Sequence, residues 1–320
     1  MSIRLKLILL TLFTVLVMLS SPWLDFSEAD SAEIQQMIIY ELRIPRMLFG
    51  FIAGSGLALC GMVFQAMFRN PLATPFTLGV ASGASLGAAI SVYAGISFTI
   101  LGLSATSLSA FAGALIAISF VYSISRFRFG FSGETLLLTG VAISFFFSSL
   151  ILFIQYLSNV ADSFQIIRWL MGSLTVVGYQ ELRQLLPFVG LMAVVIIYLS
   201  RELNLLMAGD EIALSRGVSV KYVRYALFFV TSLCVGAIVA LCGPIGFVGM
   251  MVPHICRLII GEDHRYLIPA TLLFGGSFLV ICDTLARLVI APAELPVGVI
   301  TTLLGGPFFL WLLMRYKSQH

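Results

Sequence analysis

Long apolar stretches, separated by short polar segments, follow one another along the chain. A bilayer has a hydrocarbon core about 30 Å thick, and a helix crosses it with about 20 apolar residues, which is the length of these stretches. The strict alternation of a transmembrane β-strand is missing from them. The pattern predicts an all-α polytopic membrane protein with about ten transmembrane helices. The predicted spans are residues 5–23, 46–67, 75–95, 99–123, 133–157, 184–200, 223–242, 244–260, 267–290 and 297–314.

The first stretch follows Arg4 and Lys6, as the apolar region of a signal peptide would. A small-x-small cleavage site is missing near residues 20–23. We therefore expect this stretch to be a membrane helix.

Basic residues predict how the spans are oriented. An even number of spans puts both termini on one side, and if that side is the cytoplasm, 13 of the 18 basic residues face inward. The positive-inside rule then predicts that both termini are cytoplasmic. The five basic residues left on the outer side are Arg43, Arg46, Arg168, Arg183 and Arg287.

Charged residues are scarce, with 18 Lys and Arg and 15 Asp and Glu among 320 residues, while 60% of the chain is hydrophobic and the mean hydropathy is +1.06. These values exclude an ordinary water-soluble protein. We expect residues 1–320 to form a single transmembrane domain in a lipid bilayer. The net charge of +3 is small and its basic residues are scattered, which argues against nucleic acid as a partner.

The chain lacks the residues of most energy-coupling chemistry. A Walker A loop needs a lysine after a glycine, and the only lysines are Lys6, Lys221 and Lys317. The three histidines and five cysteines are dispersed, so we expect no metal site, no cofactor and no catalytic residue. The spans also lack a carboxylate cluster for proton relay. The sequence indicates a passage or a scaffold that takes its energy from another protein.

Two segments between the spans are notable. Residues 30–42 place apolar side chains at a helical spacing among acidic ones, which predicts a helix lying on the outer surface. Residues 201–224 carry seven charges in 24 positions on the cytoplasmic side. In a chain so poor in charge, this second segment is a candidate contact for a soluble partner.

Glycine and proline lie inside several spans, and the chain shows a weak internal repeat. Irregular backbone at membrane depth is tolerated where it is buried in protein or lines a cavity. The tetrapeptide ALCG occurs at residues 58–61 and again at 240–243, which would pair the second to fifth spans with the seventh to tenth. Transporters are often built from such repeats, although chance explains four residues equally well.

Several motifs resemble one transporter family in order along the chain. They are RIPR at residues 43–46, GSGLALCGMVFQAMFRNPLATPFTLGVASGA at 54–84, WLMGSL at 169–174, GDEIALSRGVSV at 209–220, GPIGFVGMMVPHICR at 243–257 and ARLVIAPAELPVGVITTLLGGPFFLWLL at 286–313. With these motifs the chain resembles the permease subunits of FecCD-type bacterial ABC importers, which carry iron-siderophores, haem or vitamin B12. The resemblance implies a dimer with an identical or related second permease, two separate ATP-binding subunits, and a periplasmic substrate-binding protein.

The resemblance also implies a docking surface. In the family, arginines that match Arg43, Arg46 and Arg287 receive acidic residues of the binding protein. Snorkelling to lipid headgroups, or local pairing of Arg287 with Asp283 one helical turn earlier, is the alternative. On the docking interpretation, Arg46→Glu leaves the permease folded and weakens the stimulation of ATP hydrolysis by the binding protein.

Residues 201–224 match the segment that couples the family's permeases to their ATPases. Gly209, Glu211, Ala213 and Gly217 are the candidate contacts, because small residues alternate there with charges. A solvated loop is the alternative. A bulky residue at position 217 is expected to uncouple or release the ATPase.

By the same resemblance, a cytoplasmic gate forms where the fifth span begins. Its candidate residues are Thr77, Ser82, Ser132 and Gly133. Ordinary helix capping and the helix dipole account for Ser132 equally well.

The function expected from these observations is import of a metal chelate, foremost a ferric siderophore, across the bacterial inner membrane. Haem and vitamin B12 are alternatives within the family. A secondary transporter and a structural or signalling scaffold are alternatives outside it, and transport that depends on both ATP and a binding protein would eliminate them.

Overall fold

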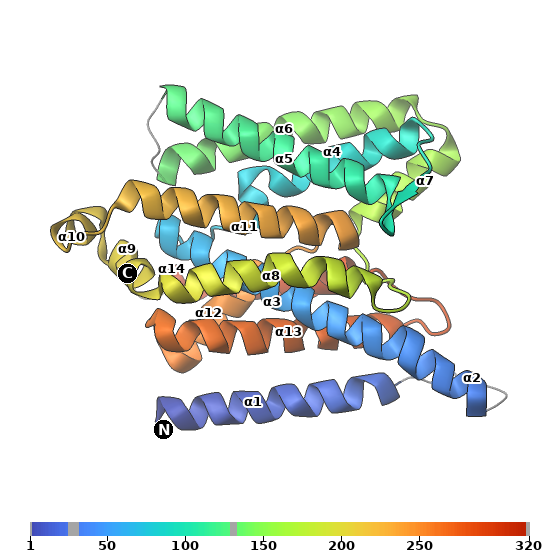
Figure 1. Ribbon diagram of the computed structural model, residues 1–320, viewed down its shortest axis with the longest axis horizontal. Helices are drawn as coiled ribbons and strands as arrows, with labels where there is room; N and C mark the ends of the chain where they lie inside the picture. The colour runs from blue at the N-terminus through green and yellow to red at the C-terminus, as the bar shows by residue number, and fades with distance from the viewer. Residues whose placement is uncertain (1, 25–31, 129–132, 318–320) are drawn as a thin grey trace.

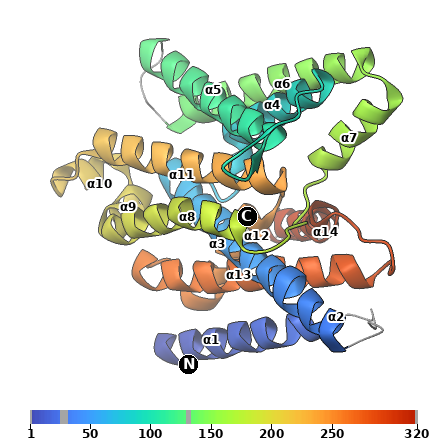
Figure 2. The same ribbon diagram turned by 45° about the vertical axis from the view of Figure 1, so that its right-hand side comes forward.

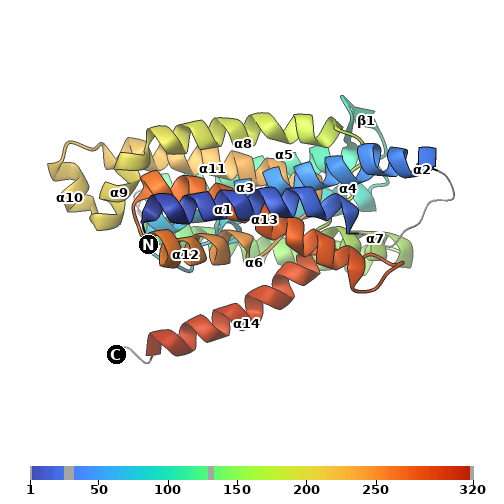
Figure 3. The ribbon, with the colours of Figure 1, turned by 90° about the horizontal axis from the view of Figure 1, so that it is seen from below.

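A computed structural model describes residues 2–24, 32–128 and 133–317. Most of its helices run side by side as a bundle (Figure 1), whereas the last helix points away from it (Figure 3). Ten of the described helices are mainly apolar. They are α1 (Ile3–Ser20), α3 (Ile44–Phe68), α4 (Val80–Tyr93), α5 (Ala105–Arg128), α6 (Gly133–Leu157), α8 (Gln180–Tyr198), α11 (Val220–Cys242), α12 (Val248–Ile260), α13 (His264–Leu288) and α14 (Val297–Lys317). Shorter elements are η1 (Ser21–Trp23), α2 (Ala32–Met37), η2 (Ile38–Arg43), η3 (Pro75–Leu78), α7 (Val160–Leu170), α9 (Ser200–Ala208), α10 (Asp210–Ser215) and the paired strands β1 (Thr99–Ile100) and β2 (Leu103–Ser104).

The ten predicted spans correspond to these ten helices. Seven of the described helices are long and apolar enough to cross a membrane, and α4, α12 and part of α14 are shorter apolar helices. The start of α1 and the end of α14 lie at the end of the bundle that also carries α9 and α10 (Figure 3). This arrangement agrees with the predicted all-α fold and with termini on one side, so we call that end cytoplasmic and the opposite end outer.

Helix α3 forms the centre of the bundle. Within its most apolar window 78% of the residues are buried, compared with 11% for α1, 22% for α8 and 28% for α6. It packs against α13, α12, α8 and α11. The poorly buried helices present apolar side chains outward, as expected of surfaces that contact lipid.

Glycines let the central helices approach one another closely. A Cβ built on Gly61 of α3 would lie 1.7 Å from the carbonyl oxygen of Gly249 in α12. A Cβ on Gly54 would lie 2.4 Å from the carbonyl oxygen of Gly275 in α13. Small residues serve this purpose in membrane helices, where association depends on close van der Waals packing.

The expected surface helix at residues 30–42 lies only in part within the described residues, and from residue 33 it is instead a continuation of α3. Residues 33–68 form one helical run, in which η2 makes a π-helical stretch between α2 and α3. Pro45 lies at the start of α3, where a missing backbone N–H is tolerated. The charges that suggested a surface helix lie on the part of this run beyond the apolar span.

The two halves suggested by the weak repeat have similar element patterns. In each half a long helix is followed by a short one and then by two long ones, α3 to α6 and α11 to α14. Both short helices begin after a residue with a positive φ, Gly79 at 76° before α4 and Phe247 at 66° before α12. The interrupted spans therefore occupy matching positions in the two halves.

Candidate functional site

Four charged side chains meet at the outer ends of α3 and α13, and we name them the outer charge cluster: Arg46, Asp283, Arg287 and Glu294. Arg46 donates from Nε and Nη2 to Asp283 at 2.8–3.1 Å, and from Nη1 to Glu294 Oε2 at 2.8 Å. Arg287 Nε lies 3.5 Å from Asp283 Oδ2. The planar guanidinium of Arg46 therefore bridges two carboxylates from different elements.

The two acidic residues of the cluster differ strongly in exposure. The side chain of Asp283 is 6% exposed, whereas that of Glu294 is 46% exposed. Asp283 is fixed inside the bundle by two arginines. Glu294 precedes α14 and contacts Arg46 from the solvent side.

The predicted docking arginines are thus only in part a free outer surface. Arg46 and Arg287 are largely buried and ion-paired within the chain, and Arg43, half-buried, donates to the backbone oxygen of Pro22 at 3.1 Å. The pairing of Arg287 with Asp283, considered as an alternative from the sequence, is present. The bridge from Arg46 to Glu294 was missed, because these residues are 248 positions apart.

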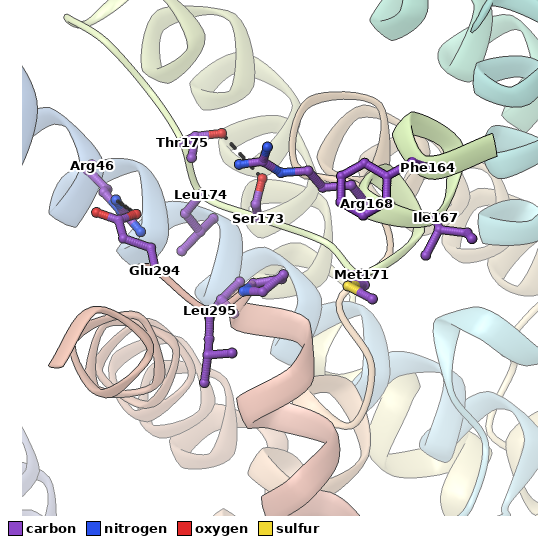
Figure 4. A pocket seen from close by; sticks show the side chains of 12 residues that line it. Arg46, Phe164, Ile167, Arg168, Met171, Ser173, Leu174, Thr175, Glu294 and Leu295 are labelled. Atoms are coloured by element: carbon purple, nitrogen blue, oxygen red, sulfur yellow. Dashed lines mark hydrogen bonds and ion pairs between the residues drawn. The ribbon is translucent and has the colours of Figure 1, made fainter. Parts of the chain in front are cut away.

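Two outer cavities lie on either side of the contact between Arg46 and Glu294, and both residues line both cavities. The first cavity, of about 390 Å³, has an apolar wall from α7 and the exposed Arg168 (Figure 4). The second, of about 430 Å³, includes Arg43 and Arg287. The ion pair therefore forms part of the partition between them.

Three of the sequence motifs converge just below the first cavity. Ser173 N donates to Cys242 O at 2.8 Å, which joins WLMGSL to the start of GPIGF. A Cβ on Gly172 would lie 2.4 Å from Pro244 O, and one on Gly298 would lie 2.1 Å from Met171 O. Glycine is needed where these backbones touch, and Gly172 also has a φ of 67°. Figure 2 shows α7, which leads into this junction, between the outer end of α6 and the start of α14.

A groove of about 400 Å³ runs between α4 and α6 on the cytoplasmic side of this junction. Its polar lining consists of the hydroxyls and the amide of Ser82, Ser85, Ser144, Ser148 and Gln155. Phe76, Ile151 and Leu170 supply apolar surface. The hydroxyls of Ser82 and Ser144 donate to the backbone oxygens of Gly79 and Gly140, and most of the exposed lining is apolar. The groove is therefore a mainly apolar surface with a few neutral polar groups and no charged side chain among its lining residues.

The predicted gate residues are separated by the structure. Ser82 lines the groove, and Thr77 lies beside α6, where a Cβ on Gly140 would be 2.4 Å from Thr77 O. Gly133 instead lies near Phe68 at the end of α3. Ser132 is outside the described residues. The expected proximity of α6 to the segment around Thr77 is therefore present, but Gly133 is not part of the groove.

At the cytoplasmic end, the charged segment folds into the helix pair α9 and α10. Gly209 separates the two helices with a φ of 127°, and Gly217 follows α10 with a φ of 80°. Glu211 is exposed, but Ala213 is fully buried. Ala213 therefore packs α10 onto the bundle and does not face outward.

Exposed apolar side chains accompany these charges. Ile212 and Leu214 of α10 are 48% and 60% exposed, and Tyr222 at the start of α11 is 74% exposed. Arg224 anchors the segment, with Nη2 donating to Asp210 Oδ1 at 2.8 Å. A small apolar surface is thus presented on a helix that is fixed by an ion pair.

Asn204 ties this segment to α13. Its Oδ1 accepts from the backbone N–H of His264 at 3.0 Å and from Nδ1–H of the same residue at 2.6 Å, and its Nδ2 donates to Asp263 Oδ1 at 2.9 Å. This contact was not predictable from local sequence, because Asn204 and His264 are 60 positions apart. Bonds from the backbone N–H of Arg265 and from Asn204 lower the pKa of Asp263 below its ordinary value. The ionised Asp263 therefore contributes to the stability of the folded state. This stabilisation is fully present above about pH 4 and is lost as the pH falls through the lowered pKa.

Asn204→Ala should lower the free energy of unfolding by about 1–3 kcal/mol, because it removes three hydrogen bonds and leaves a buried imidazole without its acceptor. Glu211→Ala in the neighbouring helix changes an exposed side chain and should stay within about 0.5 kcal/mol of the parent. The thermal unfolding midpoint of the detergent-purified permease measures both. Equal midpoints for the two variants would contradict the anchoring role of Asn204.

Comparison with known proteins gives consistent matches over nearly the whole chain. The model of the FecCD transport family matches residues 3–315. The vitamin B12 import system permease protein BtuC of Klebsiella pneumoniae is 39% identical over 97% of this chain and 93% of its own length. The hemin transport system permease protein HmuU of Yersinia pestis is 38% identical over 87% and 83%. A solved structure, described as an inward-facing ABC transporter of the metal-chelate type, superposes with a TM-score of 0.87 at 31% identity over 97% of this chain and 98% of that one.

Proposed function

The chain belongs to the FecCD transport family, and from that membership we propose that it carries a metal chelate, foremost a ferric siderophore, across the bacterial inner membrane. It is a permease subunit of an ABC importer, and ATP hydrolysis belongs to separate subunits. The observation that supports this cargo class is the groove between α4 and α6, whose mainly apolar wall with a few neutral polar groups is typical of a site for a bulky organic molecule such as a chelate.

Haem and vitamin B12 are the alternative cargoes, since relatives of this chain are named for each. The deciding experiment reconstitutes the permease with its ATPase and its binding protein in lipid nanodiscs. ATP hydrolysis is then measured with the binding protein loaded with ferric siderophore, haem or cobalamin. Stimulation by the siderophore supports the proposal, and stimulation by haem or cobalamin alone would contradict it.

The assembly we propose contains a second permease, identical or related, two ATP-binding subunits and a periplasmic binding protein. The binding protein docks at Arg43, Arg46 and Arg287, which lie around the second outer cavity. Complementary charge at such a surface mainly orients the partner and speeds association. The cargo then enters the groove, with Thr77, Ser82, Ser132 and Gly133 proposed near its cytoplasmic exit.

The α9–α10 segment is the proposed contact for the ATPase, with Gly209, Glu211 and Gly217 at or near its exposed face and Ala213 holding it to the bundle. The apolar surface of α10 supports this role. Gly217 is a poor position for testing it, since any side chain there would also strain a backbone with φ of 80°.

Leu214→Glu offers a cleaner test, because Leu214 is 60% exposed and its replacement should hardly affect folding. We expect the variant to lose about tenfold or more in ATPase association, since a charge is unfavourable at the apolar centre of an interface. Copurification of the ATPase measures the effect. Leu214→Met keeps the apolar character and is expected to copurify normally, and normal copurification of Leu214→Glu would contradict the proposed contact.

A further inference from the structure

The contact between Arg46 and Glu294 conflicts with a simple docking surface. If a partner carboxylate is to bind Arg46, the guanidinium needs free donors on its outer side. Asp283 accepts from Nε and Nη2, and Glu294 accepts from Nη1, so these bonds use three of the five N–H groups of the guanidinium. A partner carboxylate that bound Arg46 beside Glu294 would be the third carboxylate around one guanidinium, and like charges so close together repel one another.

The positions of the two acidic residues indicate which one can leave. Asp283 is 6% exposed, lies within α13 and also pairs with Arg287. Separating it from Arg46 would leave a buried charge poorly compensated, which is strongly unfavourable. Glu294 is 46% exposed and lies in the connection before α14. Water can solvate its carboxylate as it leaves, so releasing it costs little.

We infer that Glu294 is an intramolecular placeholder on Arg46, which a carboxylate of the docked binding protein replaces. This inference rests on the proposed docking function. It adds that Glu294 competes with the carboxylate of the binding protein for Arg46. The incoming carboxylate takes over the Nη1 donor, and the number of charge-assisted bonds on Arg46 is unchanged. Arg46 keeps its bonds to Asp283 throughout the exchange, so the guanidinium is never unpaired.

The exchange has a geometric consequence for the two outer cavities. Arg46 and Glu294 line both of them, and their contact forms part of the partition. Thr175 is the third residue that lines both cavities, so the departure of Glu294 removes one of three side chains shared by the first cavity, with its apolar wall and Arg168, and the second, which holds Arg43 and Arg287. Docking therefore widens the outer opening at the place where cargo is delivered, directly above the glycine junction of residues 172, 243 and 298.

Glu294→Gln tests the placeholder directly, because glutamine keeps the size of the side chain and removes its charge. The binding protein encoded with this permease is titrated against the complete transporter in nanodiscs. We expect it to bind Glu294→Gln about two- to fivefold more tightly than the parent, the range set by loss of a partly exposed ion pair. Glu33→Gln is the matched control, since Glu33 is an exposed carboxylate of α2 on the same side. It measures how much tightening comes merely from removing one negative charge.

Arg43→Glu separates this inference from the docking function on which it rests. If Arg43→Glu binds the binding protein as tightly as the parent, the proposed docking at this surface is wrong, and the inference about Glu294 is then wrong as well. If Arg43→Glu weakens binding while Glu294→Gln equals Glu33→Gln, docking stands and the placeholder is wrong. Weaker binding by Glu294→Gln would also overturn it, because Glu294 would then contribute to the docked state. A cooperative thermal unfolding transition of each variant confirms that all three are folded.

Discussion

Gly61→Ala should leave little folded permease in the membrane. The added methyl group would lie 1.7 Å from the carbonyl oxygen of Gly249 and 2.4 Å from its carbonyl carbon. These are backbone atoms of α12, so no side chain can rotate away, and the two helices must separate. Overpacking usually costs about 1–3 kcal/mol, and we expect this variant at or above the upper limit because the clash is with backbone. The yield of monodisperse protein after extraction, together with its thermal midpoint, measures the loss.

Gly190→Ala is the matched control for this prediction. Gly190 also lies inside a long helix, α8, but a Cβ there meets nothing within 4 Å. Alanine favours the helix by up to about 1 kcal/mol, so the variant should be neutral or slightly more stable than the parent. If Gly61→Ala gave the same yield as Gly190→Ala, the close approach of α3 and α12 would be disproved.

Arg46→Glu should destabilise the permease by about 3–5 kcal/mol and abolish transport, since it leaves a buried charge without its partner and adds a third carboxylate beside Asp283 and Glu294. The sequence alone predicted that this variant would remain folded. The structure changes that expectation, because the side chain of Arg46 is only 14% exposed. Thermal unfolding of the purified permease and uptake by proteoliposomes measure the two effects.

Two controls separate charge from position at the outer charge cluster. Arg46→Lys keeps the charge but loses the forked geometry that binds both carboxylates, so its stability should lie between the parent and Arg46→Glu. Arg43→Glu reverses a charge on the same surface at a half-buried side chain and should cost less. If Arg46→Glu and Arg43→Glu unfold at the same temperature, the cluster does not hold α3 to α13.

Spans were predictable from sequence because one physical requirement determines them, the burial of about 20 apolar residues in lipid. This requirement identified even the short helices α4 and α12. It gave no information on the helical run before Arg43, because charges such as Glu33 and Glu41 mark the end of the apolar span and not the end of the helix.

The sites were predicted less completely than the spans. Resemblance led to Arg46 and to α10, but the functional contacts of each depend on partners distant in sequence, Glu294 for the first and the bundle beneath Ala213 for the second. Contacts between residues so far apart in sequence follow from how the helices pack in three dimensions. No local pattern of residues predicts them, which is also why the contact of Asn204 with His264 was not predicted.

The unbroken helix that includes α3 makes the centre of the permease a lever. Its 36 residues extend about 54 Å, well beyond a hydrocarbon core of about 30 Å. If the helix rocks about its cytoplasmic end by only about 5°, its outer tip sweeps through about 5 Å. A slight tilt at its cytoplasmic end would therefore be amplified at its outer end.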